Sequence, residues 1–423
     1  MNLFRLFIIT FLLILSSKST RACSAYKVTV ADHTMLGVNF DTWTTHPKIW
    51  FETKGYGSVF TGANYDEDGL RPQSGMNEYG LAFGTLATQT PPNRKEMLNK
   101  KQITSRINYL KDILHSCRTV EEVKAYIEQY DHSSLQNDVF IYTDKSGKYL
   151  IVEPYTITLG DDNKYVLANF CPSTINDFST IKQQRYINGA AFLKNKIDTS
   201  LAFCTALSDT MHVCREKMGD GTLLTTIWNP SNGVFHLFFY HDYSHKVTLD
   251  LKNELAKGDH LLEITSLFPA NPEYQKLLDF KTPANSKYID KFILVCFFLF
   301  LFSFVYFAID YFRNRKIKYS YVKLLLAALS TFMAYYMIIL AREQGIFYFP
   351  APYQSSQFGL IEIAAYLPFL VLLLIIPFVI INISVIKNNL WKTISKLLFT
   401  LNNFAYILLI VLFFYWGLYD VIH

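Results

Sequence analysis

The chain has 423 residues, of which 51% are hydrophobic and 16% aromatic, a composition too apolar for a disordered or fibrous protein. The formal net charge is +5 at pH 7, but three of the 40 Lys and Arg residues lie in residues 1–22 and ten in 291–423. Residues 23–290 therefore hold 27 basic against 31 acidic side chains, a balance of −4. Because a nucleic-acid binder needs its basic excess on the folded part to contact phosphates, nucleic acid is excluded as a partner.

The first 22 residues have the pattern of a secretory signal peptide. Arg5 precedes an apolar run over residues 6–15, which is too short to cross about 30 Å of hydrocarbon. Small residues at Thr20 and Ala22 suit a signal peptidase that cuts before Cys23. The pattern predicts an exported protein whose mature chain begins at Cys23. The alternatives are an uncleaved signal anchor and a lipid-modified Cys23.

Residues 23–285 are expected to form one α+β domain. Alternating or apolar stretches bounded by turn residues predict strands over 25–30, 138–142, 149–153, 223–228 and 234–240. Helical patterns predict helices over 103–116, 120–130 and 184–196. Thr119 is the expected N-cap of the second helix, with Glu122 three residues on. Strand pairs joined by tight turns and mixed with helices favour a layered domain.

Residues 286–423 are expected to form an all-α transmembrane region. Four apolar runs are each long enough for a membrane helix, over 292–309, 324–341, 358–384 and 397–418. Pro368 and Pro377 predict kinks in the third of these helices. The sequence therefore predicts an integral membrane protein with four spans.

The connectors between these runs differ in charge. The first and third connectors carry basic residues, namely Arg313, Arg315, Lys316, Lys318 and Lys323, then Lys387, Lys392 and Lys396. The second has none beyond Arg342 at its edge. Because positive connectors stay in the cytoplasm, residues 23–290 and the chain end are expected on the extracytoplasmic face, which is periplasmic if the cell is bacterial.

A cysteine at the start of a mature chain carries two useful groups. The Cys23 thiol can attack a carbonyl. Its α-amine, with an ordinary pKa of about 7.7–8.0, can take the thiol proton and later pass it to a leaving amine. Such a cysteine needs no histidine partner, which is the logic of an N-terminal nucleophile hydrolase.

Several short motifs follow Cys23 in order. They are Cys23-Ser24-Ala25, Gly37-Val38-Asn39-Phe40-Asp41, Ser74-Gly75-Met76-Asn77-Glu78-Tyr79-Gly80-Leu81, Val166-Leu167-Ala168-Asn169 and Gln184-Arg185-Tyr186. In order and approximate spacing they resemble the choloylglycine hydrolase family of linear amide C–N hydrolases, which includes bile salt hydrolases and penicillin V acylases. The resemblance covers residues 23–240, and it implies a four-layer αββα fold. The membrane tail lies outside it.

The resemblance also implies the roles of five residues. Cys23 would be the nucleophile and, through its amine, the base. Asp41 would hold that amine by a charge-assisted hydrogen bond. Asn77 would donate to the oxyanion of the tetrahedral intermediate. Asn169 would orient the substrate or the amine, and Arg185 would assist charge near the thiolate.

Val38 departs from the family pattern, which commonly has an arginine beside the nucleophile. Valine cannot donate a hydrogen bond to a carboxylate or stabilise a thiolate. Either the substrate differs from that of the family, which we favour, or the site is inactive.

The remaining cysteines and the histidines suggest structure more than chemistry. Four exported cysteines, Cys117, Cys171, Cys204 and Cys214, can pair among themselves in three ways and leave Cys23 as a thiol, while Cys296 lies in a span. Three histidines, His236, His241 and His245, lie in a stretch typical of a strand and turn, without zinc-site spacing. No metal or cofactor is expected.

The sequence thus predicts a membrane-anchored extracytoplasmic amidohydrolase acting on a small N-acyl amide. The rivals are an acyltransferase, in which an amine intercepts the thioester, and an inactive ectodomain that serves as a receptor or assembly module. The short link from Lys281 to Phe292 keeps the domain near the bilayer, so an amphiphilic substrate is expected. The sequence carries no signal for the acyl chain, the leaving amine or the oligomeric state.

Overall fold

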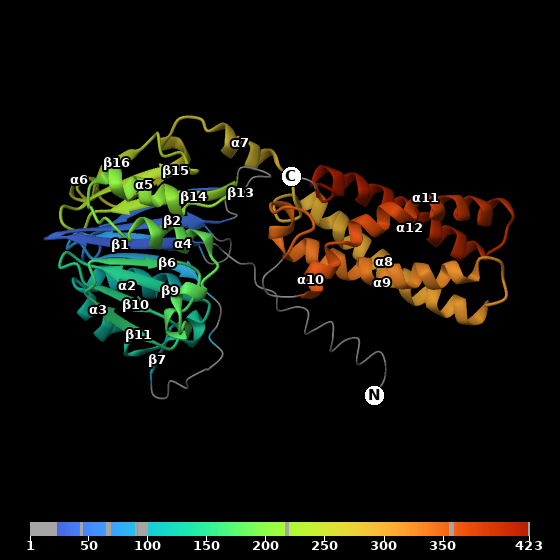
Figure 1. The fold of residues 1–423 in the computed structure, drawn as a ribbon, viewed down its shortest axis with the longest axis horizontal. Helices are drawn as coiled ribbons and strands as arrows, with labels where there is room; N and C mark the ends of the chain where they lie inside the picture. The colour runs from blue at the N-terminus through green and yellow to red at the C-terminus, as the bar shows by residue number, and fades with distance from the viewer. Residues whose placement is uncertain are drawn as a thin grey trace. The chain divides into compact units, whose positions relative to one another are not determined.

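The computed structural model of the chain consists of two compact units (Figure 1). It describes residues 23–42, 45–64, 69–88, 91, 100–215, 220–354 and 359–421. The larger unit contains Thr20–Arg215 and Gly219–Leu277, and the smaller one contains Leu278–His423. The expected signal peptide over residues 1–22 lies outside the described residues.

Two antiparallel sheets form the centre of the larger unit. The first runs in the order β12, β1, β2, β14, β15, β16, with β13 paired to β14. Its strands are β1 (Ser24–Val30), β2 (His33–Asp41), β12 (Lys164–Leu167), β13 (Cys214–Arg215), β14 (Asp220–Trp228), β15 (Val234–Phe239) and β16 (Val247–Asp250). The second runs in the order β11, β10, β9, β6, β5, β4, β3, β17. Its strands are β3 (Pro47–Glu52), β4 (Ser58–Asn64), β5 (Leu70–Asn77), β6 (Ala82–Ala87), β9 (Asp138–Thr143), β10 (Tyr149–Val152), β11 (Ile157–Gly160) and β17 (His260–Glu263).

Helices cover the outer face of each sheet, which makes four layers (Figure 1). Helices α4 (Gln184–Phe192) and α5 (Leu201–Met211) pack on the first sheet in a core that includes Tyr26 and Leu207. Helices α2 (Arg106–Ser116) and α3 (Val120–Ile127) pack on the second sheet around Phe60 and Ile113. Between the sheets, the Ser74 hydroxyl lies 3.1 Å from that of Thr226. The order helix, sheet, sheet, helix agrees with the expected αββα layering.

Shorter elements complete this unit. They are the parallel pair β7 (Lys101–Gln102) and β8 (Tyr130–Asp131), the helices α6 (Leu251–Leu255) and α7 (Pro272–Asp279), and the 3-10 turns η2 (His132–Leu135), η3 (Pro172–Thr174), η4 (Phe178–Thr180) and η5 (Ile264–Leu267). The five predicted strands are present within one to three residues at each end. Thr119 caps α3 by accepting a hydrogen bond from the Glu122 amide at 3.3 Å, as expected.

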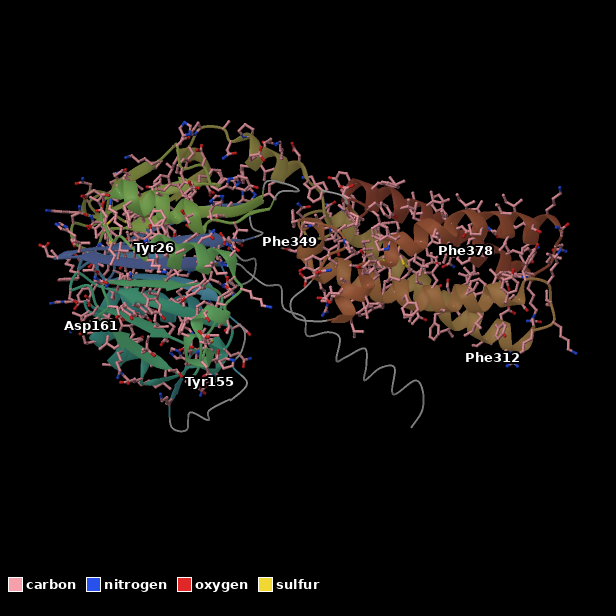
Figure 2. The ribbon with its side chains drawn as sticks, viewed as in Figure 1. Tyr26, Tyr155, Asp161, Phe312, Phe349 and Phe378 are labelled. Atoms are coloured by element: carbon pink, nitrogen blue, oxygen red, sulfur yellow. The ribbon has the colours of Figure 1, made fainter. Side chains whose placement is uncertain are left out.

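The smaller unit consists of helices α8 (Lys287–Arg313), α9 (Ser320–Arg342), α10 (Gly359–Ala364), α11 (Leu367–Lys387) and α12 (Thr393–Tyr415), with the turn η6 (Gln344–Phe347). Among the residues that the structure describes, four segments are long and apolar enough to cross a membrane, α10 and α11 counting as one. The third run is interrupted before Pro368, which lies in the first turn of α11, where its missing N–H costs no hydrogen bond. Pro377 lies inside α11. Figure 2 labels Tyr26 in the layered unit and Phe378 in this one.

A buried ion pair joins the ends of three of these helices. Lys323 Nζ lies 2.6 Å from Asp310 Oδ2, and the two side chains are 1% and 6% exposed. Ser395 at the start of α12 donates to the same carboxylate oxygen at 2.9 Å. Charged groups in an apolar bundle are costly unless paired, so this pair ties the first and third connectors together.

The expected pairing among all four exported cysteines is wrong. Cys117 and Cys204 are free and buried, each in the core of a different helix layer. Cys117 packs with α2 and α3, whereas Cys204 packs with α4 and α5, so the two sheets separate them. Buried cysteines here act as small apolar side chains.

Candidate active site

Cys23 lies at the open end of the β1–β2 hairpin. The pairing of Ser24 with Asn39 places Cys23 and Asp41 at the same end of the two strands. Both residues are buried, and the Cys23 thiol donates to the Asp41 carbonyl oxygen with a sulfur–oxygen distance of 3.7 Å. The hairpin thus brings together the first two residues expected in the site.

The Asp41 carboxylate is held by the neighbouring strand. Thr222 pairs with Asp41 across β14 and β2, and its hydroxyl donates to Asp41 Oδ1 at 2.5 Å. A β-bulge follows Thr222 on β14, and bulges re-aim the side chains beside them. In the full-length chain the Cys23 nitrogen is a peptide nitrogen. A cut before Cys23 would turn it into an amine at the same end of the hairpin as Asp41.

Gln73 is a residue beside Cys23 that the sequence reasoning missed. Its side-chain Nε2 lies 3.6 Å from Cys23 Sγ and also donates to the Thr85 carbonyl oxygen. Gln73 is the extra residue of a bulge in β5, because Ser74 pairs with Thr61 while Pro72 pairs with Gly62. The signal that could have found it is Pro72, since proline inside a strand is confined to edges and bulges.

Asn169 and Arg185 form a second group with Gln183. Arg185 Nη2 donates to Asn169 Oδ1, and the Asn169 backbone N–H donates to Gln183 Oε1 at 3.0 Å. Asn169 Nδ2 donates to the Ala87 carbonyl at 2.7 Å, two residues along β6 from the carbonyl that Gln73 binds. The structure therefore brings Asn169 and Arg185 together and fixes them to the end of β6.

Asn77 does not have the geometry of an oxyanion donor, and this expectation is corrected. Its Nδ2 donates to the carbonyl oxygens of Leu114 and Cys117 at 2.7 and 2.8 Å. Its Oδ1 accepts from the amides of Tyr79 and Leu81 at 3.1 and 3.0 Å. Both donor hydrogens are therefore used on carbonyls at the end of α2, which the helix itself leaves without partners.

The motif around Asn77 is thus a structural turn. It joins β5 to β6, with Gly80 at a φ of 82°, in the left-handed region that favours glycine. A Cβ on Gly80 would also lie 2.2 Å from the Pro230 carbonyl oxygen. In this structure the motif serves the turn and the C-terminus of α2.

Val38 is buried between the two sheets. It is 1% exposed, and a Cβ built on Gly84 of β6 would lie 2.7 Å from its Cγ2. Glycine at position 84 therefore leaves room for the valine methyl group. The chain uses this position for packing between the sheets.

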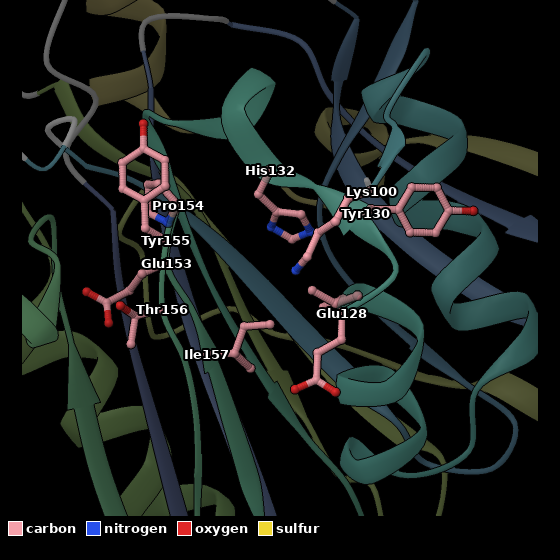
Figure 3. Close-up of a pocket in the computed structure, with 10 residues that line it drawn as sticks. Lys100, Glu128, Tyr130, His132, Glu153, Pro154, Tyr155, Thr156 and Ile157 are labelled. Carbon is pink, nitrogen blue, oxygen red and sulfur yellow. The ribbon is translucent and has the colours of Figure 1, made fainter. Parts of the chain in front are cut away.

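A surface pocket of about 200 Å³ lies elsewhere in the larger unit (Figure 3). Its lining includes Lys100, His132 and Glu153 but no residue that the sequence assigned to the site. Within the described residues, no group of three or more His, Cys, Asp or Glu side chains could hold a metal ion.

His132, which lines this pocket, is expected to make the unit sensitive to acid. It is 3% exposed and its Nε2 lies 2.6 Å from the Tyr109 hydroxyl. Burial, with a smaller effect from the charge of Lys100, lowers the pKa of His132 to about 4. The unfolded chain, with an ordinary histidine pKa of about 6.5, takes up this proton first as the pH falls. The stability from this group is therefore complete above pH 6.5 and is lost as the pH falls towards 4, by about 3 kcal/mol.

We expect the melting temperature of the purified chain to fall more between pH 7 and 4.5 than that of His132→Gln. Glutamine can keep a hydrogen bond to Tyr109 but does not titrate. Parallel pH profiles for the two proteins would show that His132 is not the source of the sensitivity.

No known family profile matches the sequence, and no curated protein matches it. Among solved structures, two variants of conjugated bile acid hydrolase from Clostridium perfringens are similar, at 17% and 16% identity and a TM-score of 0.45. The similarity covers 59% and 58% of this chain and 97% of each neighbour. Penicillin V acylase from Agrobacterium tumefaciens is similar at 16% identity and a TM-score of 0.40, over 51% of this chain and 82% of that one. At this identity the similarity concerns the fold alone. Cys23 and the residues around it are therefore the basis for a function.

Proposed function

We propose that the chain is an N-terminal nucleophile amidohydrolase that cleaves a linear, non-peptide C–N bond of an N-acyl compound. The observation that carries the proposal is the Cys23 thiol at the end of the β1–β2 hairpin, in hydrogen-bond contact with the Asp41 main chain and the Gln73 side chain. A thiol with polar groups arranged around it at a predicted cleavage point is what this chemistry requires.

The proposed reaction begins after a cut before Cys23. The free α-amine takes the thiol proton, and the sulfur attacks the carbonyl carbon of the amide. The tetrahedral intermediate collapses when the α-ammonium returns the proton to the leaving nitrogen, which leaves a thioester on Cys23. Water, deprotonated by the same amine, then attacks the thioester and releases the carboxylic acid.

Asp41 would hold the α-ammonium in this reaction. Its carboxylate is buried and already oriented by Thr222, which supports a fixed acceptor rather than a mobile one. Asn169 and Arg185 would position the substrate, since their side chains are locked to each other and to β6.

The proposal places the layered unit on the extracytoplasmic face of a membrane. Four helices of sufficient length and hydropathy support an anchor, and the basic connectors support this orientation. Seven residues join the end of α7 at Asp279 to the start of α8 at Lys287, a reach of at most about 25 Å. That tether favours an amphiphilic N-acyl substrate in the outer leaflet.

Two measurements on the protein purified after expression of the full-length gene test this function. Intact mass should show a mature chain that begins at Cys23, and a panel of N-acyl amides should be hydrolysed with a kcat/KM that rises with acyl length. A mature N-terminus elsewhere, or a blocked one, would remove the amine from the mechanism. A flat or inverted chain-length profile would remove the amphiphilic substrate while leaving the amidohydrolase.

A further inference from the structure

Strands β5 and β6 separate beside Cys23. They pair at Met76 with Ala82, Gly75 with Phe83 and Ser74 with Gly84, and no pair is formed beyond Gly84. β6 continues to pair with β9 as far as Ala87. Carbonyls two residues apart on a strand point to the same edge of that strand. The carbonyls of Thr85 and Ala87 therefore both point to the edge of β6 where β5 is no longer paired.

Along this edge, side-chain amides supply the hydrogen bonds that a neighbouring strand would otherwise make. Gln73 Nε2 donates to the Thr85 carbonyl, and Asn169 Nδ2 donates to the Ala87 carbonyl. Buried carbonyls need a partner, so each amide is held in place by a backbone group that has lost its ladder bond. The Gln73 amide is thus fixed before any substrate arrives.

The bulge in β5 is what aims Gln73 at this edge. Gly62 lies opposite the bulge, and a Cβ there would lie 2.0 Å from the Arg71 carbonyl oxygen, so only glycine fits. Gln73 is 7% exposed. A primary amide has two N–H groups. One serves Thr85, and Nε2 lies 3.6 Å from Cys23 Sγ, which leaves the second N–H for the reacting atoms.

We infer that Gln73 is the side-chain donor to the oxyanion during acylation of Cys23, an inference that rests on the proposed function. In the tetrahedral intermediate the oxyanion is two bonds from the sulfur, so a donor in contact with the sulfur is within reach of it. Asn77 is saturated and Val38 has no donor, so neither can take this role. A fixed donor aimed at developing charge is the arrangement that lowers acyl-transfer barriers.

Two probes of Cys23 separate this role from a general effect on the thiol. A p-nitrophenyl octanoate ester acylates the thiol: the S–C bond forms, the C–O bond to nitrophenol breaks, and nitrophenol leaves with the proton. An oxyanion forms and collapses on the way. Iodoacetamide alkylates the same thiol by displacing iodide and forms no oxyanion. Both products are located on Cys23 by mass spectrometry of the full-length protein.

In Gln73→Met, which keeps the side-chain length, and in Gln73→Ala, acylation should fall by about 10²–10³-fold while alkylation stays within about threefold of the wild-type rate. Gln129→Ala, on the surface, should leave both rates unchanged. Unchanged acylation in the Gln73 variants, or an equal fall in both rates, would overturn the inference alone. A wild-type protein that is alkylated but never acylated at Cys23 would overturn the proposed function with it.

Discussion

Replacing Cys23 with alanine is expected to abolish amide turnover, by a factor on the order of 10⁴–10⁶. The proposed thioester has no other place to form, because the remaining thiols of the larger unit that the structure describes are packed in helix–sheet cores or bound to Thr88. The melting temperature should fall only slightly, as expected for a small cavity at a buried thiol whose hydrogen bond to Asp41 is long at 3.7 Å. The measurements are hydrolysis of the N-acyl amide panel and thermal unfolding of the same preparation.

The matched control is Cys117→Ala. Cys117 is also a buried thiol in the same unit, but it packs against α2 and α3 and lines no part of the site. It should lose some stability through the small cavity and keep the wild-type kcat. Full activity in Cys23→Ala, or equal losses in the two variants, would end the assignment of the nucleophile.

Replacing Asn77 with alanine is expected to destabilise the larger unit instead of slowing the chemistry. The Asn77 side chain is 0% exposed, so water cannot replace it. The change leaves two backbone carbonyls and two backbone N–H groups without the partner that this side chain provides. Each buried group left without a partner costs about 1–3 kcal/mol, and relaxation of the structure relieves part of this cost. The free energy of unfolding should therefore fall by about 3–5 kcal/mol. In a unit of this size that corresponds to a fall in Tm of about 10 °C.

Asn163→Ala, at an exposed position, is the control and should change Tm by no more than about 2 °C. Below its own melting temperature, Asn77→Ala should retain a kcat within a few-fold of wild type. A large fall in kcat with an unchanged Tm would return Asn77 to the role of oxyanion donor.

Elements with local signals were predictable from the sequence. The strands over 138–142 and 149–153, and those over 223–228 and 234–240, were expected as pairs joined by tight turns. The structure has Gly147 and Gly233 at positive φ between these paired strands. Thr119 predicted the start of α3, and the apolar runs predicted the four long helices. Each signal lies within a few residues of the element that it specifies, so no knowledge of the packed chain is needed.

The proximity of Cys23 and Asp41 was implied by the resemblance to a known family, not by a predicted hairpin. The structure shows that one hairpin, which sets its own register, joins them. Strand β5 was missed because it is mostly buried and interrupted by Pro72, so it has neither clean alternation nor a clear boundary. Because β5 was not predicted, Pro72 was not read as the mark of a bulge, and Gln73 was missed with it.

The sequence by itself determined the α+β character, the apolar tail and the cysteine at the predicted cleavage point, because composition and local pattern carry them. Only the tertiary structure decided which amide faces that cysteine. Asn77 is drawn to the end of α2, while Gln73 is turned towards Cys23 by a bulge and a carbonyl on β6. The physical reason is that a polar side chain bonds to whichever buried group lacks a partner, and the location of those groups depends on how distant strands and helices pack.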